Sequence, residues 1–396
     1  MLARVQASGR LSKLKPQVIL LGLVSLLNDS ASEMLFPLLP VFLTTTLGAT
    51  PVVIGLIEGA ADGLASILKY FSGLWSDRMP KRKPFIVTGY SLAVFARLII
   101  AGATAWPMVL GARLLDRTGK GIRSAPRDAL ISDVTPPEQR GRAFGFHRAL
   151  DHTGAIVGPL LAVLVLQGLG MTLRQAFFCA VIPGAIGVFV LVFFLKEEEP
   201  HAEAKKKVVL DVPLPRRFRG AISAIALFSL SNSSDAFLIL QAHAAGVTTA
   251  MLPVLWAAHH VIKALFSTAA GSLSDRVDRR YLLFAGWLSY AVIYALFPFA
   301  HSLTAFVVLF VAYAIPFTVS EGAERAWIAD LVPAEARGKS FGIFYLVSGL
   351  CVLAGTALFG LLYQNVSPQA AFFTGAGLSV AAAVLVMLVG RKPALA

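Results

Sequence analysis

The stretch GLWSDRMPKR at residues 73–82 decides the architecture of this chain, because a second copy, GSLSDRVDRR, stands 198 positions later at residues 271–280. A second block repeats at nearly the same offset, with DVTPPEQRGRAFG at 133–145 returning as DLVPAEARGKSFG at 330–342. Self-similarity over so long a period indicates a duplicated architecture. The sequence therefore predicts two half-length units that carry the same short loops in the same order.

The composition places these units in a membrane. Of 396 residues, 57% are hydrophobic and only 14% are charged, and the mean hydropathy is +0.73. A soluble domain of this length would need more polar surface. The net charge of +13 does not indicate a nucleic-acid partner, since no basic stretch is interleaved with aromatic residues. We expect a polytopic protein whose surroundings are the lipid bilayer.

The apolar runs predict twelve membrane-spanning helices, each of about 20 residues. Their expected limits are 17–40, 52–74, 84–105, 107–130, 143–167, 176–195, 219–240, 250–270, 281–300, 304–328, 340–363 and 370–390. The longest hydrophilic break separates them six and six. We predict an N-terminal six-helix bundle at 1–195, a cytoplasmic linker at 196–218 and a C-terminal six-helix bundle at 219–396.

The distribution of Lys and Arg predicts the orientation. Twenty-four of these residues fall on one side of the predicted spans, and only Arg174 falls on the other. Because positive charges collect on the cytoplasmic side, both termini and the linker are expected in the cytoplasm. The expected location is the plasma membrane, which in a bacterium is the inner membrane.

Taken together, these features resemble the major facilitator superfamily over the whole chain. The shared signatures are the doubled loop motif, the PLLP sequence at 37–40, Arg113-x-x-Asp116 in span 4 and Gly154-x-x-x-Gly158-Pro159 in span 5. Span 4 departs from the family pattern R-x-x-Q-G, because Asp116 and Arg117 take its last two places. The resemblance implies an all-α membrane protein of two pseudo-symmetric six-helix bundles.

The resemblance also implies a latch that closes the cytoplasmic end in an outward-facing state. It assigns the latch to Asp77 with Arg78 and to Asp275 with Arg276, and makes Asp133 and Asp330 their charge partners. The alternative is that these charges only set the topology. The span 5 motif is associated with antiporters in this superfamily, so Gly158 and Pro159 join the gating candidates. The alternative there is a glycine face that only packs.

Ionisable residues at membrane depth are the candidates for function, since each costs about 2.5–3.5 kcal/mol at the centre of a span. The charges of span 4 fall within an arc of about 140° on one helix face. Spans 1, 4, 7 and 10 line the central cavity in the superfamily. The predicted substrate contacts are Asn28, Arg113, Asp116, Arg117, Lys120, Arg123, Asn232, Asp235 and Glu321.

Four carboxylates are the candidates for coupling to protons, because a buried acid beside a cation takes up and releases a proton as its surroundings change. They are Asp29, Glu33, Glu58 and Asp62. The alternative is that they are permanent partners of the span 4 cations and never titrate. No cofactor is expected, and the coupling ion is the proton. The spacing of Cys and His residues predicts no metal site.

The predicted function is proton-coupled export of a small organic solute, anionic or zwitterionic, by a monomer. The rival with the same fold is a proton-driven importer of an anionic nutrient. A membrane receptor that does not transport is a further alternative, although it leaves the duplicated loops without a purpose. An enzyme is not expected, because the sequence contains no phosphate-binding glycine loop, G-x-S-x-G elbow or H-E-x-x-H motif.

Overall fold

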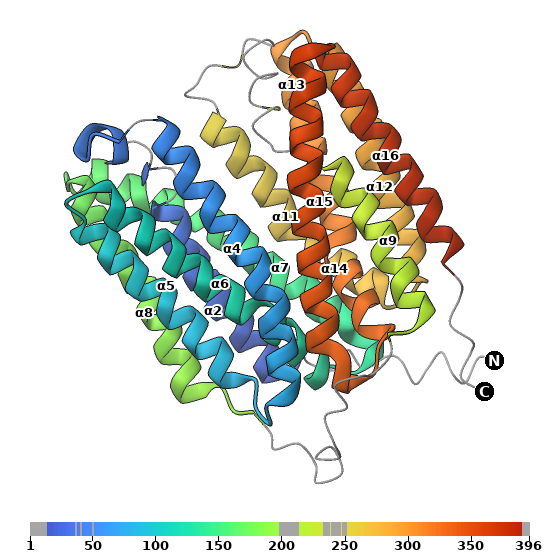
Figure 1. Cartoon of the computed structure of the whole chain (residues 1–396), viewed down its shortest axis with the longest axis horizontal. Coiled ribbons are helices and arrows are strands. Elements are labelled where there is room, and N and C mark those ends of the chain that lie inside the picture. Colours follow the sequence, from blue (N-terminus) through green and yellow to red (C-terminus); the bar gives the residue numbers. More distant parts are fainter. Residues whose placement is uncertain are drawn as a thin grey trace.

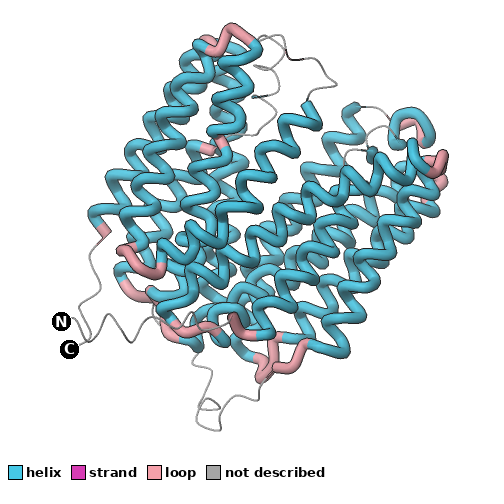
Figure 2. Tube along the Cα trace, turned by 180° about the vertical axis from the view of Figure 1, so that it is seen from behind, coloured by secondary structure: helices cyan, strands magenta, loops and turns pink. Residues whose placement is uncertain are grey.

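We analysed a computed structural model, which describes residues 14–35, 38–39, 42–49, 51–197, 214–232, 238, 247 and 252–389. The described part of the chain is helical and contains no strand (Figure 2). The first half comprises α2 (Pro16–Leu35), α4 (Pro51–Arg78), α5 (Lys83–Gly102), α6 (Trp106–Val134), α7 (Arg140–Val163) and α8 (Leu173–Phe194). The second comprises α9 (Arg216–Ser231), α11 (Leu252–Ser274), α12 (Arg279–Leu296), α13 (Leu303–Ala312), α14 (Ala314–Asp330), α15 (Arg337–Asn365) and α16 (Pro368–Leu388).

Eight helical segments of the described chain are long and apolar enough to cross a membrane. The segments that do not meet this criterion are α4, α6, α9 and α11, and α6 fails because its charged residues interrupt the apolar run. With α13 and α14 counted as one span, the helices follow one another as the twelve predicted segments. The all-α membrane fold expected from the sequence is confirmed.

The tenth predicted span is broken into two helices. It was expected to run without interruption over 304–328, but α13 ends at Ala312 and α14 begins at Ala314. Pro316 explains the break, because a proline has no N–H to donate and its ring clashes with the carbonyl of the residue four positions earlier. That residue is Ala312, where α13 ends.

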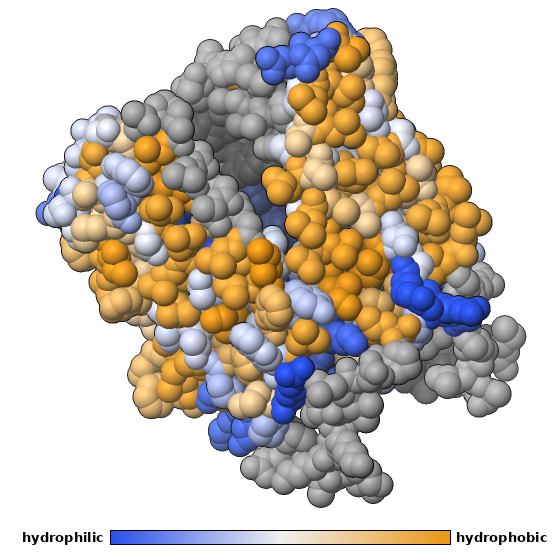
Figure 3. Space-filling model, viewed as in Figure 1, coloured by the Kyte–Doolittle hydropathy of each residue, from blue (hydrophilic) through white to orange (hydrophobic). Residues whose placement is uncertain are grey.

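The two halves meet along two helix pairs. In Figure 1, α4 lies beside α15 and α7 lies beside α11, and these pairs make the most extensive contacts between the halves. The connections α4–α5, α6–α7, α11–α12 and α14–α15 lie at one end of the molecule, which we call the motif end. Figure 3 shows a hollow between the halves on the side away from the motif end.

The two halves have different cores. In the second half the rings of Phe228 on α9 and Trp287 on α12 stack with their centroids 4.8 Å apart, and Tyr290 and Tyr294 stack at 4.7 Å. Aromatic pairs add about 0.5–1.5 kcal/mol beyond the area they bury. The first half has its own aromatic pair, Phe42 and Phe177, with ring centroids 5.1 Å apart in edge-to-face contact, and small residues such as Ala96 belong to the same cluster.

Glycines permit the closest approach between the halves at the motif end. A Cβ atom placed on Gly73 of α4 would lie 2.1 Å from the carbonyl oxygen of Gly338 on α15. The second helix pair repeats this geometry, since a Cβ on Gly271 would lie 2.1 Å from the carbonyl oxygen of Gly141. Small residues let helix backbones touch in this way, and here they do so at equivalent places in the duplicated blocks.

Gly73→Ala is expected to force α4 away from α15 at the motif end. Overpacking of this kind costs about 1–3 kcal/mol, which corresponds to a shift of about 5–150-fold toward the form that is open there. The separation is measured between spin labels on Glu138→Cys and Glu335→Cys, two exposed positions on opposite halves. Cys179 and Cys351 are first replaced by alanine.

Gly111→Ala is the matched control, because a Cβ on Gly111 has no atom within 4 Å. It should leave the distance between the labels unchanged. An unchanged distance in Gly73→Ala as well would show that the glycine contact does not hold the two halves together.

Candidate functional site

Two aspartates at the motif end bind the backbone of the opposite half. The Asp77 carboxylate, in the last turn of α4, accepts hydrogen bonds from the N–H groups of Gly338 (2.9 Å) and Lys339 (2.6 Å). These donors belong to the first turn of α15. The first N–H groups of a helix have no partner within the helix and carry the positive end of its dipole. A carboxylate from the other half therefore caps α15.

The same contact recurs in the duplicated copy. Asp275, which follows α11, accepts hydrogen bonds from the N–H groups of Gly141 (2.7 Å) and Arg142 (2.8 Å) in the first turn of α7. Burial raises the pKa of the Asp275 carboxyl, against the opposing effects of Arg279 and of the two N–H donors. Because only the ionised form accepts both bonds, acidification through this raised pKa weakens the contact.

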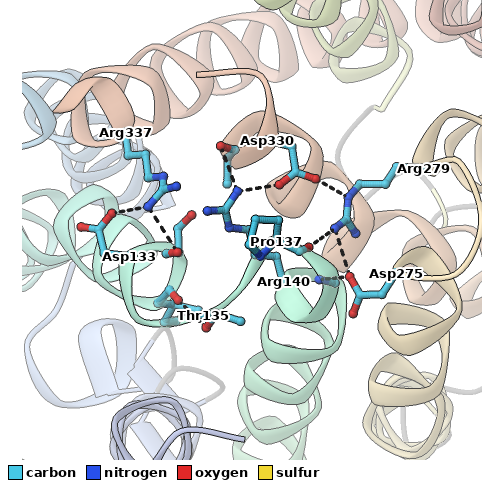
Figure 4. A network of polar contacts seen from close by, with 12 residues as sticks. Asp133, Thr135, Pro137, Arg140, Asp275, Arg279, Asp330 and Arg337 are labelled. Carbon is cyan, nitrogen blue, oxygen red and sulfur yellow. Dashed lines mark hydrogen bonds and ion pairs between the residues drawn. The ribbon is translucent and has the colours of Figure 1, made fainter. Parts of the chain in front are cut away.

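Arginines continue each aspartate contact into a chain of ion pairs. Arg82 lies 3.0 Å from both Asp77 and Asp133, and Arg337 of the other half donates to Asp133 at 2.6 Å. In the copy, Arg279 pairs with Asp275 at 3.0 Å and with Asp330 at 2.9 Å, and Arg140 donates to Asp330 at 2.6 Å (Figure 4). Each chain crosses from one half to the other, so the motif end is held closed.

The structure gives this pairing to Arg82 and Arg279, not to the expected Arg78 and Arg276. Both expected residues are exposed. Arg78 directly follows Asp77 on a helix, and adjacent side chains point about 100° apart. Arg82 precedes α5 and is directed back to the aspartates of α4 and α6. The sequence contained a signal for this pairing. The two copies of the first repeated block are 198 residues apart and those of the second block are 197 apart, and Arg82 and Arg279 are also 197 residues apart.

A polar cavity of about 240 Å³ lies within the first half. Among the described residues its walls come from α2, α5 and α6. They carry five basic and three acidic side chains, which leaves an excess of two positive charges. The lining residues are Asp29, Ser32, Glu33, Leu35, Ala96, Arg97, Ile100, Arg113, Asp116, Arg117, Lys120 and Arg123.

The charges of this cavity are arranged by type. The α2 wall carries Asp29 and Glu33, whereas all the other charged lining residues belong to α5 and α6. Asp116, the lining acid from α6, lies between cations, with Arg113 at 3.5 Å and Arg117 at 3.8 Å. Acids thus dominate one wall and cations the other.

Hydrogen bonds and close packing hold the acidic wall in place. The buried Arg97 of α5 donates to the side chains of Asn28 and Ser32, both at 2.8 Å, and Asn28 donates to Asp29 at 3.0 Å. On its other side α2 lies against α7, where a Cβ on Gly158 would be 2.6 Å from the Ser30 carbonyl oxygen. Pro159 follows within the same helix.

A separate, partly buried cluster joins the two halves. Glu321 of α14 lies 3.3 Å from Lys263, 3.6 Å from His152 and 3.8 Å from Arg148. His152 of α7 also meets His260 of α11, with their Nδ1 atoms 3.2 Å apart. Since α7 belongs to the first half and α11 and α14 to the second, the cluster is a further link between the halves.

Seven of the thirteen predicted substrate and coupling residues line the cavity together: Asp29, Glu33, Arg113, Asp116, Arg117, Lys120 and Arg123. Asn28 lies behind the wall and binds Arg97. Glu321 belongs to the cluster between the halves, where Lys263 and His152 hold it, and it is not among the lining residues. Asn232 ends α9 and its backbone N–H bonds within that helix. Asp235 and the side chains of Glu58 and Asp62 lie outside the described residues.

Arg97 and Ser32 were missing from the predicted site. A lone arginine in the otherwise apolar stretch 83–102 was the available signal for Arg97. Ser32 carries no charge, and its signal was its place with Asn28, Asp29 and Glu33 on one side of span 1. Four charged side chains form the described ion pairs across the halves at the motif end. Asp133 and Asp330 were predicted, but Arg140 and Arg337 were not.

A duplicated helical bundle with a charged cavity and a closable end defines a multi-pass membrane transporter. The sequence profile of the Major Facilitator Superfamily matches residues 21–258 and 220–395. An uncharacterised MFS-type transporter of Methanocaldococcus jannaschii is 32% identical over 95% of this chain and 96% of that protein. The chain belongs to the Major Facilitator Superfamily, and it is therefore a transporter and not an enzyme.

Other relatives and structures agree with this membership. A probable 4-methylmuconolactone transporter of Cupriavidus pinatubonensis is 27% identical over 83% of this chain and 79% of that protein. The multidrug resistance protein MdtH of Salmonella arizonae is 27% identical over 78% and 76%. The human organic anion transporter MFSD10 has a TM-score of 0.76 at 18% identity, over 94% of this chain and 100% of that one. The fucose:proton symporter FucP of Escherichia coli has a TM-score of 0.77 at 14% identity, over 95% and 98%.

Proposed function

We propose that this transporter exports a small organic solute bearing an anionic group, in exchange for protons, by alternating access to the cavity between α2, α5 and α6. The observation that carries the proposal is the gathering of acids and cations from three helices around one cavity. Charges are too costly to leave among lipid tails, so such a gathering serves a polar solute or an ion.

The positive excess of the walls supports an anionic group on the solute. Arg113, Arg117 and Lys120 offer charge-assisted hydrogen bonds, which are about twice as strong as neutral ones. A cavity of about 240 Å³ is smaller than the about 300–1,000 Å³ of sites for drug-sized ligands. A small carboxylate or phosphate compound therefore fits better than a bulky hydrophobic drug.

Asp29 and Glu33 are the proposed proton carriers. They face the same cavity as Arg113, Arg117 and Lys120. A carboxylate shifts its proton affinity with hydration and with the distance to nearby cations. Both change when the cavity opens to the opposite side, so proton release is linked to the conformational cycle.

The closed motif end supports an outward-facing state. Lys and Arg residues stand in or beside all four connections at this end, and positive charges favour the cytoplasmic side of a membrane. On this assignment both termini are cytoplasmic, and the hollow faces outward from a plasma membrane. One chain contains both halves, and we propose that it works as a monomer.

Export is our first assignment of direction. Its support is the similarity to a multidrug resistance protein and the Gly154-x-x-x-Gly158-Pro159 motif of α7. Proton-driven import of an anionic nutrient is the second candidate. The positive excess of the cavity favours it, because an anion binds better to a site whose acids are already protonated.

Reconstitution in vesicles with an imposed pH gradient tests the proposal. The probes are small carboxylates, phosphates and amino acids loaded at equal concentration on both sides. Export by exchange predicts that a transported solute accumulates in the compartment from which protons leave. Accumulation in the compartment that protons enter identifies the importer. No gradient-dependent movement of any probe contradicts proton coupling.

Arg113→Ala is expected to weaken binding of an anionic solute by about 10–150-fold. The reason is the loss of hydrogen bonds to a charged group, worth about 1.5–3 kcal/mol in total. Arg113→Lys keeps the charge and should fall between this variant and the unaltered protein. The measurement is the KM of gradient-driven uptake in vesicles.

Arg216→Ala serves as the control for Arg113→Ala. Arg216 is exposed at the start of α9, a helix that contributes none of the described lining residues of the cavity. Arg216→Ala should leave KM unchanged. If Arg113→Ala has the same KM as the unaltered protein, Arg113 does not bind the solute.

A further inference from the structure

We infer that the exported solute is a zwitterion, with a cationic group that binds Asp29 and Glu33 and an anionic group that binds the cations of α6. This inference rests on the proposed proton-coupled export and narrows its substrate class. The observation behind it is the separation of charge in the cavity, with the two acids on α2 and four of the five cations on α6.

Exchange requires that protons and solute exclude each other from the site. Coupling free energies are reciprocal, so a proton that improves solute binding is itself bound better when the solute is present. A purely anionic solute has this relation to Asp29 and Glu33, because their protonation removes two negative charges from its surroundings. An anion and protons would therefore move together and not in exchange.

A cationic group on the solute reverses this relation. An ammonium group stabilised by the carboxylates of Asp29 and Glu33 needs them ionised, and protons need the same oxygens. Solute and proton then compete for one place, as exchange demands. The cations of α6 line the opposite wall of the same cavity and would bind the anionic end, so the two walls recognise opposite poles of one molecule.

The other charged groups near the acidic wall do not alter this assignment. Asp116 of α6 lies between Arg113 and Arg117, which compensate its charge. Lys120 and Arg123 of α6 line the same cavity as Asp29 and Glu33. Arg97 of α5 also lines it.

The remaining helices that pack on α2 are α7 and α8. From α7, Asp151 acts electrostatically on Asp29, and it is itself paired with Arg148 at 2.9 Å and faces His147 at 3.5 Å. The charged residue of α8 is Arg174, which donates to the Ala101 carbonyl oxygen at the end of α5. Because Arg148 compensates the charge of Asp151, α7 leaves the assignment unchanged.

The volume of the cavity accommodates such a solute. A cavity of about 240 Å³ leaves room for a small amino acid. Its two charged ends can then reach opposite walls.

The test compares solutes that differ only in charge. The probes are ω-amino acids of two to six carbons. Each is compared with the simple carboxylate and the simple amine of the same chain length. Binding to the purified full-length protein is followed by its thermal melting at several pH values, because a ligand that binds only the native form raises Tm. The control variants are Glu138→Gln and Glu335→Gln, which remove exposed acids at the motif end.

The zwitterion assignment predicts that one or more amino acids raise Tm. The matched carboxylates and amines should need at least tenfold higher concentrations for the same rise in Tm. The affinity of the amino acids should fall toward acid pH, by up to about tenfold per pH unit for competition with one proton. Glu33→Gln and Asp29→Asn should remove both the pH dependence and the preference over the matched carboxylate. The control variants should keep them.

Two results overturn the assignment. One is a matched carboxylate that binds as well as the amino acid, with an affinity that rises toward acid pH. The other is a panel in which no amino acid binds. The first leaves a proton-coupled transporter of anions in place, whereas the proposed function itself fails only if no solute moves with a pH gradient in vesicles.

Discussion

The double variant Asp77→Ala with Asp275→Ala is expected to open the motif end in most molecules. Each aspartate accepts two N–H bonds from the first turn of a helix in the opposite half and pairs with a buried arginine. Bonds to a charged group contribute about 1.5–3 kcal/mol each. Losing one aspartate therefore costs about 3 kcal/mol or more, a shift of roughly 100-fold in the ratio of closed to open forms.

The same distance between labels on Glu138→Cys and Glu335→Cys measures this shift. The unaltered protein should give mainly the short distance, and the double variant mainly a longer one. Arg82→Ala and Arg279→Ala should act in the same direction, because each leaves two carboxylates without a shared cation. Transport should slow, since the cycle then lacks a stable state that is closed at the motif end.

Arg78→Ala and Arg276→Ala are the matched controls in the same two loops. Both residues are exposed, and exposed ion pairs contribute only about 0–1 kcal/mol. These variants should keep the short distance. An opening by Arg78→Ala that equals the effect of Arg82→Ala would contradict the pairing described above.

Asp29→Asn combined with Glu33→Gln is expected to abolish coupling to the pH gradient. Neutral amides imitate the protonated acids and cannot release a proton, so the conformational cycle no longer depends on pH. The strongest ligand from the charge-matched panel should equilibrate across the vesicle membrane, whereas the unaltered protein accumulates it. A fixed gradient of two pH units drives about 100-fold accumulation for one proton per solute, which follows from 1.36 kcal/mol per unit.

Proton movement provides a second readout of the same variant. A pH-sensitive dye inside the vesicles should report proton flux on addition of solute for the unaltered protein, and none for the double variant. Glu138→Gln with Glu335→Gln removes two exposed acids and should keep the flux. Accumulation by the double variant at the original level would assign coupling to other groups, such as Glu321 of α14.

The architecture was predictable because its determinants are local and written twice. The repeated loops predicted two related halves, and the apolar runs predicted the helices of each. The break at Tyr313 was also predictable, because Pro316 has no N–H to donate to the carbonyl oxygen of Ala312. The face of α6 that carries Arg113, Lys120 and Arg123 follows from helical periodicity alone.

The partners of these charges were harder to predict, because they depend on how helices pack. Arg78 adjoins Asp77 in sequence, yet Arg82 makes the contact because the chain turns between α4 and α5. Glu321 was expected in the cavity, but α14 packs on α7 and α11, and Lys263 and His152 hold Glu321 between the halves.

The account depends most on one claim, that the acids of α2 and the cations of α6 share a water-filled cavity whose access changes sides. Ser32→Cys places a thiol in that cavity, in a chain without Cys179 and Cys351. Membrane-impermeant thiol reagents are applied to one side of oriented vesicles at a time. The account predicts reaction from the outside while the motif end is intact, and reaction from the cytoplasmic side once Asp77 and Asp275 are replaced by alanine. A thiol that reacts from neither side, or equally from both sides with the motif end intact, would contradict it.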